Sequence, residues 1–286
     1  MSTAAPVVTR FAPSPTGLLH LGHAYAAGFA FAEGRRGEGR FLVRLEDIDG
    51  TRVRPEYEDA IFEDLAWLGL NWETPVRKQS EHLQDYQTAL NQLETLGLIY
   101  PCFCTRKEIQ AEIGNAGQAP QGPDGPLYPG TCRKLQAEEV AARLASGLPY
   151  ALRLNVEKAA ALAGPLTFLE RSEGLIAAKP DLFGDVVLAR KETPTSYHLS
   201  VVVDDALQGV TLVTRGEDLK PATHLHRLLQ ALLGLPVPEW HHHGLATDEA
   251  GKRLAKRDNA RSIRSMRENG WTPAPVWDAV GLPLPQ

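Results

Sequence analysis

Short apolar runs and longer periodic segments alternate through the first hundred residues. The runs at residues 6–11 and 40–46 are typical of buried strands. The segments at 22–36, 55–68 and 79–98 carry apolar residues three or four positions apart, which predicts amphipathic helices. The expected buried side of the last helix is formed by Tyr86, Leu90, Leu93 and Leu96. This alternation predicts an α/β fold, with a parallel sheet covered by helices on both faces.

The pattern changes between residues 100 and 191. The expected helices and strands there lie at residues 99–101, 106–113, 136–145, 150–155 and 184–190. Residues 114–130 form a loop rich in Gly and Pro, and residues 156–180 are only weakly patterned. We therefore expect residues 100–191 to be an α+β insertion between residues 1–99 and 192–247, the two halves of the sheet domain.

The sheet pattern returns after residue 192. An apolar run at 199–203 ends in two acids, and a buried strand at 209–218 carries Arg215 at its carboxyl end. A helix is expected at 223–233, in which His224 and His226 should make packing or polar contacts. Three consecutive histidines then follow Trp240. Because neighbouring strand residues point to opposite faces, three in a row seldom converge on one metal ion.

Composition places the chain among ordinary globular proteins. Its 286 residues are 43% hydrophobic and 23% charged. No basic amino-terminal region and no apolar run of about 18 residues is present, so we expect a cytoplasmic protein with no membrane partner. The formal net charge of −5 excludes nucleic-acid binding by bulk charge. Any RNA contact must therefore come from a local basic patch.

The best candidate patch lies in residues 248–286, expected to be a lysine loop and a short helical segment. It comprises Lys252 to Arg257 together with Arg261, Arg264 and Arg267, the last three spaced to share one helical face. Such a run can equally be a solvated helix face.

All three cysteines lie in the expected insertion. Cys102 and Cys104 precede the long loop, and Cys132 follows it. Thiolates favour Zn²⁺, and with no histidine between His82 and His198, Tyr128 is the nearest oxygen donor for a fourth ligand. Three small buried thiols are the alternative.

Candidate chemistry also lies at the start of the chain. The first strand runs through Pro and Gly into His20 and His23, which open a helix. Unpaired N–H groups and a partial positive charge at a helix amino terminus favour phosphate, and two histidines add donors beside an anionic transition state. A surface histidine pair or half of a metal site fits the same residues.

The segment Arg10-Phe-Ala-Pro-Ser-Pro-Thr-Gly17 followed by His20-Leu-Gly-His23 resembles the adenylate-forming signature of class I aminoacyl-tRNA synthetases, in their glutamyl/glutaminyl branch. The resemblance covers nearly the whole chain, including 44–49, 197–205, 215–219 and the lysine loop. It implies a Rossmann-like class I catalytic domain with a zinc-containing inserted subdomain.

The resemblance also implies a role for each matching residue. Glutamate would be held by Arg10, Ser14, Glu46, Tyr197 and Arg215. ATP, with Mg²⁺, would be bound by His20, Gly22, His23 and Lys256, of which His20, His23 and Lys256 would be catalytic. Structural Zn²⁺ would be bound by Cys102, Cys104, Tyr128 and Cys132.

The implied reaction is ligation driven by conversion of ATP to AMP and pyrophosphate. Only a short segment follows Arg257, which resembles the short paralogues of glutamyl-tRNA synthetase. Those paralogues activate L-glutamate without tRNA and attach it to queuosine, at the anticodon wobble position of tRNA(Asp). The alternatives are charging of a tRNA 3′ end and non-catalytic tRNA binding. A monomer is expected.

Two positions depart from the family pattern. Val201 stands where the full-length synthetases commonly carry a polar Asn, and Ala255 replaces the usual Ser of the lysine signature. Loss of one ordinary hydrogen bond at Val201 should weaken glutamate binding by about 1 kcal/mol.

Overall fold

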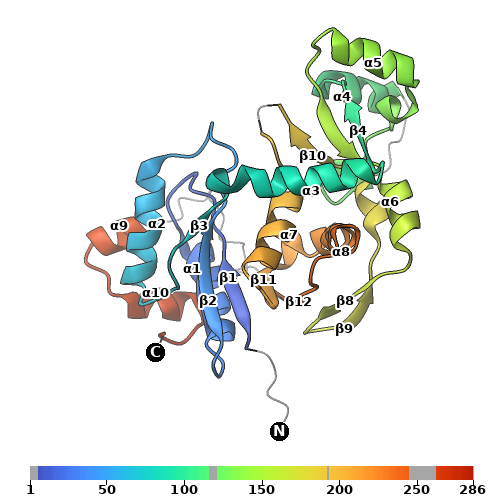
Figure 1. The fold of residues 1–286 in the computed structure, drawn as a ribbon. Coiled ribbons are helices and arrows are strands. Elements are labelled where there is room, and N and C mark those ends of the chain that lie inside the picture. Colours follow the sequence, from blue (N-terminus) through green and yellow to red (C-terminus); the bar gives the residue numbers. More distant parts are fainter. Residues whose placement is uncertain (1–5, 116–120, 192, 245–261, 286) are drawn as a thin grey trace.

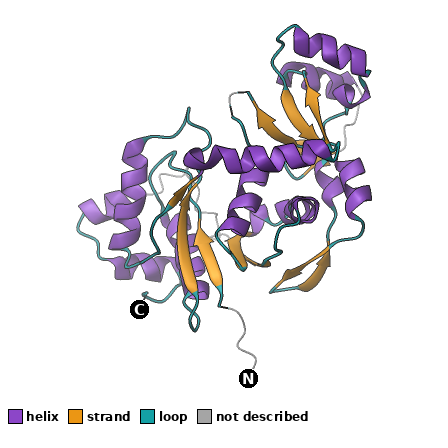
Figure 2. Cartoon of the chain, in the orientation of Figure 1, coloured by secondary structure: helices purple, strands orange, loops and turns teal. Residues whose placement is uncertain are grey.

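A computed structural model of the chain describes residues 6–115, 121–191, 193–244 and 262–285 (Figure 1). Strands and helices alternate through the first part of the chain (Figure 2). Its elements are β1 (Val8–Phe11), α1 (Leu21–Gly34), β2 (Arg40–Leu45), α2 (Pro55–Trp67), β3 (Arg77–Lys78) and α3 (Leu83–Thr95). Strands β1, β2 and β3 are parallel neighbours in that order. The predicted α/β fold with a parallel sheet is confirmed here.

Helix α3 differs from its prediction at one residue. Tyr86, Leu90 and Leu93 are buried as expected, but Leu96 is 40% exposed. The helix ends at Thr95, and Gly97 turns the chain with a positive φ of 65°. Leu96 therefore lies past the last helical turn and leaves the apolar stripe.

The middle of the chain forms a lobe at the top of Figure 1. Its elements are β4 (Ile99–Cys102), α4 (Arg106–Asn115), β5 (Gln121–Gly122), β6 (Gly125–Pro126), α5 (Ala137–Ala145), β7 (Ala151–Leu154) and β10 (Val187–Arg190). Helix α6 (Val156–Ala163) lies below the lobe and packs against α8. Strands β10, β7 and β4 form an antiparallel sheet. The cysteines lie at the end of this sheet.

Two further strands of the weakly patterned stretch lie elsewhere. Strands β8 (Thr167–Glu170) and β9 (Gly174–Ala177) belong to a second sheet rather than to the lobe, and β9 is antiparallel to β8. Trp240 pairs with Glu170 in parallel, so β8 is a neighbour of β12 (Glu239–His243). The predicted boundaries at 100 and 191 fall next to the first and last strands of the lobe sheet, β4 and β10, but the stretch between them also contains β8 and β9, which belong to the other sheet.

The last part of the chain completes the sheet domain. Its elements are α7 (Tyr197–Leu207), β11 (Leu212–Gly216), α8 (Ala222–Leu233), β12, α9 (Ile263–Glu268) and α10 (Pro273–Val280). Strands β11 and β12 are parallel. The backbone N–H of Thr211 donates to the Val8 carbonyl at 3.0 Å, which places β11 beside β1. The two parallel sheets thus meet along β1 and β11 (Figure 1).

The apolar run at 199–203 lies inside helix α7. Ser196 caps this helix by accepting from the Leu199 N–H, and every residue from Leu199 to Asp205 is buried. A helix buried on all sides shows no apolar period, which is why its pattern resembles that of a buried strand.

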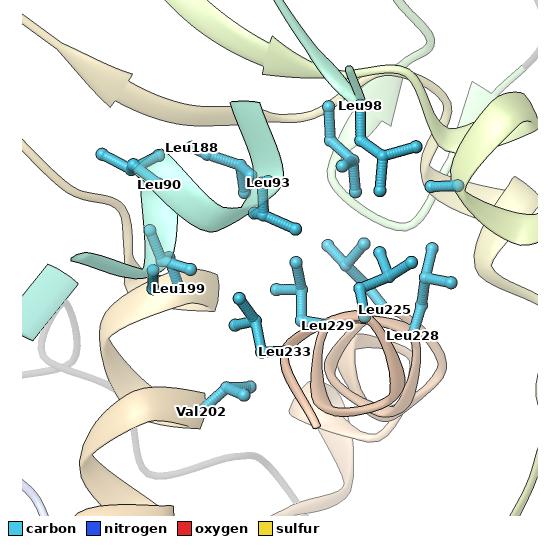
Figure 3. Close-up of a cluster of buried hydrophobic side chains, with 14 of the residues drawn as sticks. Leu90, Leu93, Leu98, Leu188, Leu199, Val202, Leu225, Leu228, Leu229 and Leu233 are labelled. Carbon is cyan, nitrogen blue, oxygen red and sulfur yellow. The ribbon is translucent and has the colours of Figure 1, made fainter. Parts of the chain in front are cut away.

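Separate clusters of buried side chains hold the helices in place. Figure 3 shows the cluster in which Leu90 and Leu93 of α3 meet Leu199 of α7 and Leu229 of α8. A second cluster joins α1 and α2 to α9 and α10. There, a Cβ added at Gly28 would lie 2.4 Å from the Trp277 ring, so only glycine lets α10 approach α1 this closely. None of the helices in the described ranges has the length and apolar character needed to traverse a bilayer.

Candidate active site

The turn that links β1 to α1 orients both histidines of the first signature. His20 is the N-cap of α1, and its Nδ1 accepts from the Gly22 N–H at 3.1 Å. The Nδ1 of His23 accepts from the His20 N–H at 3.2 Å. A neutral imidazole that accepts at Nδ1 carries its proton on Nε2. Each ring therefore holds an Nε2–H donor at the amino terminus of a helix, as phosphate binding requires.

The chain returns to this turn after the predicted lysine loop. Lys256 and Ala255 lie outside the described residues, but Ser262 forms an antiparallel bridge with His20. The N–H of Ile263 also donates to the Leu19 carbonyl at 2.8 Å. Before the loop, the ring of His243 contacts the ring of Tyr25 in α1. After the loop, Ser262 pairs with His20. The described chain on both sides of the loop therefore lies against the first turns of α1.

A cavity opens beside the turn. Its volume is about 150 Å³, and it is lined by Ser14, Thr16, Glu46, Ile48, Asp49, Arg52, Val53, Gln79 and Tyr197. The N–H of Glu46 donates to the Pro13 carbonyl at 3.0 Å, which joins the end of β2 to the loop that carries Ser14. Three of the five residues predicted for glutamate, Ser14, Glu46 and Tyr197, thus line one cavity.

Glu46 is one of two carboxyl groups that line this cavity, the other being Asp49. Burial raises the pKa of Glu46, and the nearby Arg44 guanidinium, at 3.2 Å from Oε1, opposes that rise. A carboxylate with one guanidinium partner still has acceptor capacity for an ammonium group.

Arg10, another predicted glutamate ligand, is engaged in a buried network. Its Nε and Nη2 donate to Asp205 at 2.9 and 3.3 Å, and its Nη1 donates to the Thr214 carbonyl at 3.1 Å. Arg44 donates to the same carboxylate at 2.7 Å. Although burial opposes ionisation, these two guanidinium groups hold the pKa of Asp205 below its usual value. Asp205 therefore neutralises Arg10, a pairing that the sequence did not indicate.

Arg215, the fifth predicted ligand, lies at the end of β11 and is only 6% exposed. Its Nη1 donates to the Tyr197 hydroxyl at 3.2 Å, which connects it to a side chain that lines the cavity. Its other hydrogen bonds go to Thr223, His226 and His242. His226 thus makes a polar contact, as predicted, whereas the part played by His242 was missed.

The three histidines of β12 point to alternate faces of the strand and do not converge, which agrees with the prediction. The rings of His241 and His243 lie within 4.9 Å of Phe29 and Tyr25, respectively, whereas His242 faces Glu170. Glu170 belongs to β8, in the weakly patterned stretch, so nothing in the sequence linked it to the site.

The three cysteine thiols and Tyr128 lie together at the end of the lobe sheet. Their sulfur atoms are all within 4.8 Å of one another, with Cys104 and Cys132 at 3.4 Å. The Tyr128 hydroxyl oxygen is 3.3 Å from the sulfur of Cys102 and 3.5 Å from that of Cys104. Two sulfurs bound to one Zn²⁺ at about 2.3 Å in a tetrahedron would be about 3.8 Å apart. The four side chains fit such an ion.

Part of the predicted basic patch is paired within the protein. Arg264 and Arg267 of α9 lie on one face, and both reach Glu63 of α2, at 3.4 and 2.8 Å. Lys252, Arg257 and Arg261 lie outside the described residues. The described part of the patch therefore fastens α9 to α2.

The fold and this site define a class of protein. The family described as class I tRNA synthetases (E and Q), catalytic domain, matches residues 6–283, so the chain belongs to that family. A glutamyl-Q tRNA(Asp) synthetase of Rhodobacter capsulatus is 51% identical over 282 residues, which cover 96% of this chain and 100% of the relative.

Longer relatives match over part of their length. A glutamate–tRNA ligase of Aquifex aeolicus is 40% identical, over 96% of this chain and 57% of its own. The crystal structure of a glutamate tRNA ligase from Elizabethkingia meningosepticum, in complex with its amino acid, superposes with a TM-score of 0.78 at 28% identity. That match covers 94% of this chain and 59% of the ligase.

Proposed function

We propose that this protein is a ligase that activates L-glutamate with ATP, without tRNA, and transfers it to queuosine at the wobble position of tRNA(Asp). The observation that carries the proposal is the cavity shared by Ser14, Glu46 and Tyr197 beside the histidine turn. The full-length similarity to a glutamyl-Q tRNA(Asp) synthetase supports the choice of acceptor. ATP enters with Mg²⁺, and the protein acts as a cytoplasmic monomer.

In the first step, the α-carboxylate of glutamate attacks the α-phosphate of ATP in line, and pyrophosphate leaves. The Nε2–H groups of His20 and His23, with the amino terminus of α1, stabilise the charge that develops on the phosphate oxygens. Gly22 leaves room for the adenine, and Lys256 contacts the triphosphate. Positioning and charge stabilisation suffice, so no covalent nucleophile is needed.

In the same complex, Glu46 receives the ammonium group of glutamate, and Ser14 and Tyr197 contact the substrate within the cavity. The α-carboxylate must stay free to attack ATP. The arginines therefore serve the side-chain carboxylate, with Arg10 held in place by Asp205 and Arg215 reaching it beside Tyr197. In the second step, a ring hydroxyl of queuosine attacks the glutamyl-adenylate and AMP leaves.

We also propose that Zn²⁺ is bound by Cys102, Cys104, Cys132 and Tyr128. The convergence of three thiols on one phenol supports this assignment, because small thiols that merely fill space do not need a shared polar partner. The ion would crosslink β4 to the turn at Cys132 and so stabilise the lobe, which lies within the inserted subdomain predicted at residues 100–191.

An acceptor assay tests the proposed function. Purified protein is first assayed for glutamate-dependent ATP–pyrophosphate exchange without tRNA, and then given labelled glutamate with tRNA(Asp) that carries or lacks queuosine. We expect exchange, and label only on the queuosine-containing tRNA, in its anticodon fragment after nuclease digestion. Label on a 3′-terminal adenosine would show the ordinary aminoacylating activity instead. Absence of exchange would favour a non-catalytic RNA-binding protein.

A further inference from the structure

Arg215 is a buried cation whose hydrogen-bond acceptors, among the described residues, are all uncharged. Its side chain donates to the Tyr197 hydroxyl, the Thr223 hydroxyl and one nitrogen each of His226 and His242. Within the described ranges, none of its acceptors is a carboxylate, in contrast to Arg10 and Arg44, which share Asp205. A buried charge without a counterion is costly unless a ligand supplies one.

The direction of each of these hydrogen bonds is fixed by chemistry. A guanidinium group only donates, so the histidine nitrogens that face Arg215 must be unprotonated acceptors. His242 therefore accepts at Nε2, 3.1 Å from the Arg215 Nε, and carries its proton on Nδ1. That Nδ1 lies 2.5 Å from Oε2 of Glu170, which is fully buried and accepts the proton's hydrogen bond.

His226 is fixed in the opposite tautomer. Its Nδ1 accepts from the Arg215 Nη1 at 3.2 Å, so its proton is on Nε2, which lies 3.1 Å from Nδ1 of His198. The remaining nitrogen of His198 lies 3.6 Å from Asp124. Both histidines that touch Arg215 thus direct their protons away from it, toward a carboxylate one or two side chains further on.

Burial and the Arg215 charge keep both rings neutral. They lower the pKa of His242 to about 4 and that of His226 well below its ordinary value. At neutral pH both rings are therefore uncharged, and the guanidinium is the charged group of this contact.

We propose that His226 and His242 are positioning residues that fix the Arg215 guanidinium and keep carboxylates out of direct contact with it, so that the site accepts an amino acid with an anionic side chain. The inference rests on the proposed function, because it takes glutamate as the substrate that supplies the missing anion. Glutamine fills a similar volume but brings no charge, so it should bind poorly. Glu170 sets the tautomer of His242 and acts only through it.

The test uses a pair of isosteric variants, His226→Asn and His226→Asp. Asn can present an acceptor oxygen where Nδ1 lies, whereas Asp presents the same oxygen with a negative charge. In tRNA-independent ATP–pyrophosphate exchange, we expect H226N to keep the glutamate KM within about threefold of wild type. H226D should raise it at least about tenfold, because the new carboxylate would pair with Arg215 in place of the substrate carboxylate. The kcat should change less than the KM. The preference for glutamate over glutamine should fall only in H226D.

Equal glutamate KM values for H226N and H226D, in an active protein, would overturn the inference and leave the proposed function standing. Wild-type protein that shows no glutamate-dependent exchange would overturn both. If the His226 variants do not fold, H242Q and H242L test the positioning role in another way. Gln keeps a hydrogen-bond acceptor near the position of Nε2, and Leu does not. We expect a raised glutamate KM only for H242L, and equal values would count against the inference.

Discussion

At the scale of single residues, backbone contacts fix which ring nitrogen of His20 and His23 carries the proton. In each ring Nδ1 accepts from a backbone N–H, and these hydrogen bonds cap the helix. Capping and the proposed contact with phosphate therefore use different atoms of the same ring. The two roles can be separated by substitution.

We predict that His20→Asn separates them. Asn is a good N-cap and keeps an acceptor for the Gly22 N–H, but it lacks the Nε2–H donor. The kcat of ATP–pyrophosphate exchange should fall about a hundredfold, as for other single transition-state donors, with an unchanged urea midpoint. His20→Ala, the control, should lose the activity and also about 1 kcal/mol of stability. Wild-type kcat in H20N would exclude the proposed role of this donor.

The departure at Val201 is also a single-residue effect. This side chain is 1% exposed in α7 and belongs to the apolar cluster of Figure 3, where a polar Asn would have to find partners. Burial among leucines therefore explains why an apolar residue is tolerated there.

At the scale of elements, α9 holds the chain that returns from the lysine loop against α2. The contact includes Asp64, which is fully buried and whose two oxygens have no hydrogen-bond partner among the described residues, with Arg267 at 3.6 Å. Burial raises the pKa of Asp64 to about 6. A native acid with a raised pKa binds its proton more tightly than the unfolded chain does. Its contribution to stability is therefore lost as pH rises through about 6.

We predict the consequence for Asp64→Asn. The free energy of unfolding of D64N, measured relative to wild type in urea, should increase by about 2 kcal/mol between pH 4.5 and pH 7.5. Using this difference removes the contributions of other groups, such as the buried histidines, which titrate in both proteins. Glu63→Gln, at the neighbouring exposed position, should show no such rise. A D64N difference that does not change with pH would show that Asp64 is not buried as a charge.

Elements with a clear period were predictable, and those that depend on tertiary contacts were not. Helix α8 follows its pattern, because its leucines are buried against α3, α6 and α7, whereas His224, Arg227 and Ala231 are only partly buried. Strand β8 was missed because its four residues carry only two buried side chains, and what makes it a strand is pairing with β12. Likewise, Ser14, Glu46 and Tyr197 could be nominated from family motifs. The buried partners Asp205, Glu170 and His242 could not, since no local pattern reveals a contact across more than seventy residues.

At the scale of the whole molecule, the proposed zinc site joins segments of the lobe that share little apolar packing. Helix α5 has no buried residue, and the strands of the lobe sheet are only four residues long. Below a certain core size, a bound metal commonly supplies the missing stability.

We predict that the purified protein holds one equivalent of zinc by elemental analysis. Removal of the zinc by a chelator should unfold the lobe, which would be seen as faster proteolysis within residues 100–165. The rate of ATP–pyrophosphate exchange should stay within about threefold of its original value, because the cavity lined by Ser14, Glu46 and Tyr197 is formed by other elements. Cys104→Ser should reproduce the effect, because Ser is close to Cys in volume but lacks the thiolate that would bind zinc. Less than a tenth of an equivalent of zinc, with unchanged proteolysis, would contradict the site.

Charge is also a property of the whole molecule. With a net charge of −5, the protein must bind an anionic tRNA through local cations. Two candidate arginines, Arg264 and Arg267, are paired with Glu63 and hold α9 instead. Affinity for tRNA should therefore depend steeply on salt only through the cations that are not paired in this way.

The position of Glu170 on β8 limits how such proteins can be recombined. A chimera that exchanges residues 100–165 would retain the strand that orients His242 and, through it, Arg215, but it would pair a foreign β7 with this chain's β10. An exchange of residues 100–191 would replace the whole lobe sheet and the Glu170 carboxylate with it. The lobe therefore cannot be exchanged whole without also exchanging the carboxylate that orients His242.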